Sequence, residues 1–182
     1  MKKLNHELRK LVVYGSIIFL LILIILFLRI NIIGVFVSLF LIFIASISKY
    51  YKRFTGSLSV GFELVTPVVI IFAYTYGILF AFISSIIMLL VSSFISGKID
   101  FPAMFLEVFT YLILSLLTFI LSGIEFVSLA VFMIFLRNII MAPLGVFLLG
   151  RNFIHMILIV SSDIFLNVLL IVWIGDFIVG LL

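Results

Sequence analysis

The sequence contains no cysteine, two histidines, three prolines and one tryptophan among 182 residues. Without cysteine the chain cannot form disulfides, thiolate metal sites or a cysteine nucleophile. Charged residues are scarce too, at 10% of the sequence, whereas a soluble domain has about a quarter. Hydrophobic residues make up 67% of the chain instead. This composition is typical of a protein that crosses a membrane several times.

The common catalytic motifs are missing as well. No serine lies in a Gly-x-Ser-x-Gly elbow, and no His-Glu-x-x-His zinc motif is present. His6 and His155 are far apart, and neither lies at a spacing typical of metal ligands. Residues 145–152, GVFLLGRN, resemble a phosphate-binding loop, but Arg and Asn replace its Lys and hydroxyl residue. We therefore expect no enzyme activity, cofactor, metal site or nucleic-acid partner.

Seven apolar stretches approach or reach the length of about 17 to 25 residues that one bilayer crossing requires. They are Leu11–Ile30, Ile32–Ser48, Leu58–Tyr76, Gly77–Ser96, Ala103–Leu121, Phe126–Leu149 and Phe153–Leu181. The sequence therefore predicts an all-α bundle of about seven transmembrane helices. We expect one membrane domain over residues 1–182, with residues 1–30 as an N-terminal anchor helix and residues 32–182 as the helical core.

The third stretch is the least regular of the seven. Gly61 and Glu63 weaken its start, and Pro67 lies in its middle. Such a segment can be short, broken or partly re-entrant when it is buried within the protein. Six full crossings plus one irregular segment is therefore the alternative to seven crossings.

The basic residues indicate how the chain is oriented. If all seven stretches cross, one side carries Lys2, Lys3, Arg9, Lys10, Lys49, Lys52, Arg53, Lys98 and Arg151, and the other carries Arg29, Glu125 and Asp176. Basic residues gather on the cytoplasmic side of membrane proteins. The sequence thus predicts a multi-pass protein of the cell membrane with a cytoplasmic N-terminus and an external C-terminus.

Two charges of opposite sign lie in the middle of the last two apolar stretches. Arg137 and Asp163 are thirteen residues before and thirteen residues after Gly150. If the last two stretches form a hairpin that turns near Gly150, a rise of about 1.5 Å per residue places both charges roughly 20 Å from the turn, at one depth. An intramembrane charge is costly, so each indicates function and is the most economical partner for the other. The alternative is a structural ion pair that locks two helices.

Other polar residues fall near this pair. Asn138 adjoins Arg137 in the sequence. Asn167 follows Asp163 by four residues, so Asp163 and Asn167 lie on one face of the last helix. With Glu63 of the third stretch, these residues are the expected substrate-binding set: Glu63, Arg137, Asn138, Asp163 and Asn167. Glu107 is a weaker candidate because it lies near the start of its helix.

Small residues mark faces on which another helix can approach closely. Gly34 and Ser38 form one such face, and Ser85, Ser92 and Ser96 form another. The spacing fits a neighbour within the chain, which is the commoner case, or a second subunit.

Three runs resemble the S components of energy-coupling-factor transporters. Gly61–Lys98 (GFELVTPVVIIFAYTYGILFAFISSIIMLLVSSFISGK) has a polar start, a Pro, a Gly-containing break and a helix of small residues. Leu136–Gly150 (LRNIIMAPLGVFLLG) is similar to their helix with Asn followed by Pro-Leu, and Ser161–Leu170 (SSDIFLNVLL) resembles their final helix. The resemblance covers residues 32–182. MreD-like cell-shape membrane proteins share the same general pattern.

The resemblance implies a six-helix membrane domain that captures a vitamin or similar small molecule from outside. Such a domain passes its ligand on through a membrane coupling subunit that two ATPases drive. The residues that carry over as pocket groups are Glu63, Asn138, Asp163 and Asn167. Besides the lipid bilayer, the expected partners are therefore a coupling subunit, ATPases and a small-molecule ligand.

Two features depart from that pattern. The stretch Leu11–Ile30 is an addition before the six-helix core, and Lys49, Lys52 and Arg53 place the next connection inside, where the family has it outside. The expected function is a substrate-binding subunit of an uptake transporter, and the alternative is a non-transporting scaffold of the MreD kind. A polar cavity of some hundreds of cubic ångströms favours the first, and a dry packed core favours the second. An intramembrane enzyme would need a catalytic constellation that the sequence does not contain.

Overall fold

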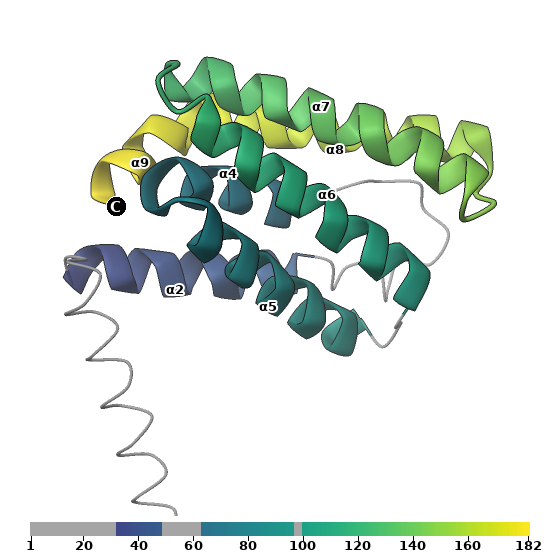
Figure 1. Ribbon diagram of the computed structural model, residues 1–182, viewed down its shortest axis with the longest axis horizontal. Coiled ribbons are helices and arrows are strands. Elements are labelled where there is room, and N and C mark those ends of the chain that lie inside the picture. Colours follow the sequence, from purple (N-terminus) through teal and green to yellow (C-terminus); the bar gives the residue numbers. More distant parts are fainter. Residues whose placement is uncertain (1–31, 49–62, 97–99) are drawn as a thin grey trace, which may run out of the picture.

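A computed structural model describes residues 32–48, 63–96 and 100–182 (Figure 1). Every regular element in these ranges is a helix, which confirms the all-α prediction. The elements are α2 (Ile32–Ile47), α4 (Val65–Tyr76), α5 (Ile78–Ser96), α6 (Phe101–Ile120), α7 (Phe126–Phe147), α8 (Phe153–Leu170), the π-helical turn η1 (Ile171–Gly175) and α9 (Asp176–Leu181). The stretch Leu11–Ile30 and the basic connections with Lys49, Lys52, Arg53 and Lys98 lie outside the described residues.

Four of the described helices are long and apolar enough to cross a membrane. They are Ile78–Ile95, Phe101–Ile120, Phe126–Phe147 and the continuous run Phe153–Leu181. The helices α2 and α4 are also apolar but shorter, with 16 and 12 residues. Large apolar side chains such as Phe94, Phe105 and Phe165 are exposed on the outside of the bundle. The structure is thus a membrane-embedded helical bundle, while the count of seven crossings stays a prediction.

The four long helices run up and down, each antiparallel to the one before it (Figure 1). The last two form the predicted hairpin. The helix α7 ends at Phe147, Gly150 adopts a positive φ of 62°, and the Asn152 side chain accepts hydrogen bonds from the backbone of Ile154 and His155 at the start of α8. Gly150 suits this turn because a side chain disfavours positive φ.

The short helix α4 occupies the centre of the bundle. Nine of its twelve residues are buried, and it packs against α2, α5, α6, α7 and α9. A helix that is apolar on all sides is stable only when it is enclosed in this way. Gly77, with φ of 89°, then turns the chain from α4 into α5. The third apolar stretch is therefore short, which was one of the alternatives for it.

The start of α4 lies at the middle of the bundle. Tyr74 at its other end contacts the ring of Phe126 at the start of α7, with 5.2 Å between ring centroids. Val65 lies eleven residues from Tyr76, and Arg137 lies eleven residues after Phe126. At about 1.5 Å per residue, both positions are about 16 Å from that common end. Glu63 does not lie within the helix, as the stretch Leu58–Tyr76 implied, but just before it and at the depth of Arg137.

Two further predictions concern helix starts and contact faces. The helix α6 begins at Phe101, two residues before the predicted Ala103, because the Asp100 side chain accepts a hydrogen bond from the Ala103 backbone and Pro102 fits the first turn. The small residues Gly34, Ser38, Ser85 and Ser92 are buried, and α2 packs against α5. The neighbour of these faces is therefore within the chain. The side chain of Ser96 lies outside the described part.

Candidate functional site

Arg137 lies between two carboxylates in the interior of the bundle. Its Nη1 is 2.9 Å from Oδ2 of Asp163, and its Nη2 is 3.2 Å from Oε2 of Glu63. All three side chains are buried. The predicted pairing of Arg137 with Asp163 is confirmed, and the second carboxylate uses the other arm of the planar guanidinium. Among the described residues, the buried charges thus form a triad rather than a pair.

The two predicted asparagines complete the surroundings of Asp163. Asn138 Nδ2 donates to Oδ2 at 3.1 Å and to the Ile134 carbonyl at 3.0 Å, while Asn167 Nδ2 donates to Oδ1 at 3.0 Å. With Arg137, three side chains therefore donate to one carboxylate. Buried charges are tolerated where such donors replace the lost water.

Tyr111 and Thr66 join the network at Glu63. The Tyr111 hydroxyl donates to Glu63 Oε1 at 3.1 Å and lies 3.2 Å from Thr66 Oγ1. The guanidinium carbon of Arg137 is 6.0 Å from the centroid of the Tyr111 ring. Sequence reasoning missed both residues. The available signal was that Tyr111 lies in the middle of an apolar stretch, four residues after Glu107 and hence on the same helix face.

We call these seven side chains the ionic network: Glu63, Thr66, Tyr111, Arg137, Asn138, Asp163 and Asn167. They come from α4, from Glu63 two residues before its start, and from α6, α7 and α8. Polar groups from four separate places in the chain thus converge at one point of an otherwise apolar bundle.

A small polar cavity adjoins the ionic network. Its volume is about 70 Å³, and it is lined by Glu63, Glu107, Arg137, Asn138, Met141, Arg151, Met156, Ile159, Val160 and Asp163. A water molecule takes about 30 Å³ of liquid, so the cavity has room for about two waters or a small ion. Four of the five predicted site residues line it, and Glu107 does as well. Asn167 does not line it but is bonded to Asp163.

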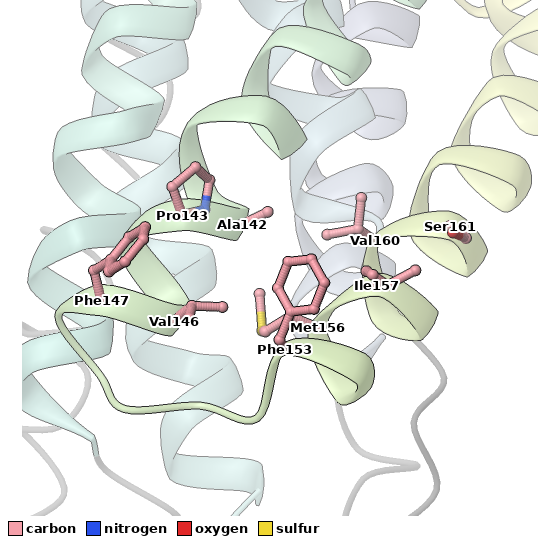
Figure 2. A pocket seen from close by; sticks show the side chains of 9 residues that line it. All are labelled: Ala142, Pro143, Val146, Phe147, Phe153, Met156, Ile157, Val160 and Ser161. Atoms are coloured by element: carbon pink, nitrogen blue, oxygen red, sulfur yellow. The ribbon is translucent and has the colours of Figure 1, made fainter.

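Larger cavities lie on the outer face of the α7–α8 hairpin. One of about 270 Å³ is lined by Ala142, Pro143, Val146, Phe147, Phe153, Met156, Ile157, Val160 and Ser161 (Figure 2). The other, of about 590 Å³, is lined by Phe135, Ser161, Ile164, Phe165, Val168, Leu169, Val172 and Trp173. Both linings are almost entirely apolar. The large volumes and the polar groups are therefore in different places.

Within residues 32–48, 63–96 and 100–182, no three His, Asp or Glu side chains are grouped closely enough to hold a metal ion. No family model, curated protein or solved structure matches the chain. The basis for a functional proposal is therefore the ionic network and the cavities beside it.

Proposed function

We propose that this chain is the membrane-embedded substrate-binding subunit of a small-molecule uptake transporter, and that the ionic network is its binding site. The observation that carries the proposal is the convergence of the network's charges in the interior. A single charged residue at the centre of a transmembrane helix costs about 2.5–3.5 kcal/mol on insertion scales. Arg137 and Asp163 both occupy the middle of such helices. The resemblance to S components points to four residues of the same network, Glu63, Asn138, Asp163 and Asn167.

The ionic network presents both negatively and positively charged side chains to the polar cavity. Its carboxylates, Glu63 and Asp163, and its guanidinium, Arg137, line the same 70 Å³ space. A solute that enters this space can compete for either partner of an existing ion pair. Since Glu63 precedes a short helix, a shift of the α4 start would release one arm of Arg137. Binding in this scheme exchanges internal bonds for bonds to the solute.

The proposal includes the cellular setting of the chain. The protein resides in the cell membrane with a cytoplasmic N-terminus, and a coupling membrane subunit with two ATPases supplies the energy. Arg151 at the α7–α8 turn then faces the cytoplasm, and Glu125 before α7 faces outside. This assignment follows from the placement of basic residues.

A non-transporting scaffold of the MreD kind is the second candidate. Two observations favour it: the network side chains bond mainly to one another, and the polar cavity is far below the 300–1,000 Å³ of ordinary small-molecule sites. In a scaffold the network serves only to hold α4, α7 and α8 together. An apolar replacement of similar volume can then take its place.

The test distinguishes a solute-binding role of the ionic network from a purely structural role in which it holds helices together. The tagged chain is purified from its own membranes in mild detergent, and co-purifying proteins and small molecules are identified by mass spectrometry. The triple variant Glu63→Leu/Arg137→Met/Asp163→Leu is purified in parallel, with Phe165→Leu on the exposed face of α8 as the control. For a transporter, the wild type and the control carry a membrane subunit, two ATPases and a solute, and the triple variant loses the solute. Envelope partners that the triple variant retains, without ATPases, would overturn the proposal and support the scaffold.

A further inference from the structure

Two of the cavities share a wall. Met156 and Val160 line both the polar cavity beside the ionic network and the apolar cavity of about 270 Å³ on the outside of the hairpin. Figure 2 shows the outer cavity between the ends of α7 and α8, with the connecting turn closing one end. In the part of the chain that the structure describes, only these two side chains are common to both linings. A path from the surrounding lipid to the buried charges therefore passes Met156 and Val160.

Met156 is suited to move. It is buried, and a Cβ added at Gly145 would lie 2.9 Å from its Cε and 3.7 Å from Cδ of Arg151. The missing side chain at Gly145 thus provides the space in which the thioether lies. Methionine is unbranched and has three rotatable bonds, so it changes shape at little cost. Of the two shared side chains, Met156 is therefore the one better able to rotate away from the shared wall, because Val160 is branched at Cβ.

The two cavities differ in chemistry. The outer one is lined by apolar side chains, including the exposed Phe147 and Phe153. Among the described charged side chains that line the inner one, three are carboxylates, Glu63, Glu107 and Asp163, and two are arginines. The volumes together come within the range of ordinary ligand sites, about 300–1,000 Å³. The joined space is apolar at one end and polar with an excess of carboxylates at the other.

We infer that the site takes a single-chain amphiphile with a small cationic head, such as a primary ammonium group. The molecule enters sideways from the bilayer between α7 and α8. Its chain occupies the outer cavity, and its head passes Met156 to reach the carboxylates. This inference rests on the proposed function, because it names the substrate class of the same network. A cationic head fits because an ammonium group donates charge-assisted hydrogen bonds to the carboxylates. These bonds replace the bonds to water that the carboxylates lose on burial.

The experiment uses the full chain in lipid nanodiscs and a ten-carbon alkylamine that carries a diazirine in its chain. After irradiation, labelled residues are located by mass spectrometry. The expected labels fall on the outer-cavity residues of α7 and α8. Unlabelled decylamine should suppress them at a concentration about tenfold lower than decanoate or decanol, a preference equivalent to 1.4 kcal/mol. This comparison on the wild type needs no variant.

Two variants test whether the amphiphile enters through the outer cavity. Ala142→Trp fills the outer cavity without touching the ionic network and should remove most of the labelling. Ile154→Trp adds the same bulk at a position on α8 that is 70% exposed and lines neither cavity, so labelling should persist. Unchanged labelling in Ala142→Trp, or equal competition by all three ten-carbon molecules, would mean ordinary lipid contact and would overturn the inference.

A water-soluble probe separates this inference from the proposed function. If ethylamine suppresses the labelling as well as decylamine does, the apolar chain contributes nothing and the lateral route is wrong, while the network remains a solute site. If no transporter subunits co-purify but decylamine is preferred and Ala142→Trp blocks it, the amphiphile site stands and the transporter proposal fails.

Discussion

The charge count of the ionic network sets the order in which its variants lose stability. Arg137 is the cation of the triad, and Glu63 and Asp163 both depend on it. Arg137→Met removes the guanidinium that both buried carboxylates bond in the described part of the chain. Asp163→Leu leaves the arginine with one carboxylate but strands donors of Asn138 and Asn167. We therefore expect Arg137→Met to be the most damaging single change.

The magnitude follows from the cost of a broken buried ion pair. Removing one partner typically costs about 3–5 kcal/mol, whereas replacing all charges by apolar groups is often neutral or stabilising by about 1–4 kcal/mol. Arg137→Met should lie at or above the upper end of the first range because two pairs are lost. The double change of Arg137 and Asp163 still leaves Glu63, so only the triple apolar variant should recover the stability of the wild type.

The assay is the thermal midpoint of the protein in detergent, followed by the loss of the monodisperse peak in size-exclusion chromatography. A loss of 3–5 kcal/mol corresponds to a midpoint lower by on the order of 10 °C for a chain of this size. Phe165→Leu on the exposed face is the control and should shift the midpoint little. A triple variant as unstable as Arg137→Met would refute the reasoning, because the charges would then not act as one compensated group.

Three further outcomes are expected. Tyr111→Phe removes a hydroxyl that donates to a buried carboxylate and should lower stability by about 1.5–3 kcal/mol in the same assay. Gly145→Ala forces the Met156 thioether to move, so it should alter labelling by the diazirine alkylamine more than it alters the thermal midpoint. For orientation, an impermeant maleimide applied to intact cells should label Gly123→Cys but not Leu148→Cys. The chain has no native cysteine, so any label on the purified protein comes from the introduced one. The reverse labelling would invert the proposed topology.

The depth of the central charges could be predicted from the sequence because helix geometry is regular. Equal spacing of Arg137 and Asp163 from Gly150 translates into equal distance from the turn, and the structure pairs them at 2.9 Å. The rotation of a helix about its own axis is harder to predict from the sequence when the segment is apolar, because few polar residues mark a face. Tyr111 was missed for this reason. The volume of the polar cavity was also beyond prediction, because it depends on how side chains of several helices interlock.

The third apolar stretch connects the irregular part of the fold to its candidate site. Because α4 starts at Val65, in the middle of the bundle, Glu63 reaches Arg137 from a position just before the N-cap residue Leu64 rather than from within a helix. Asp163 and Arg137, in contrast, are held by long helices that pack against each other. Of the three charges, Glu63 can therefore move with the smallest loss of packing, and a ligand that displaces a carboxylate from Arg137 should displace this one.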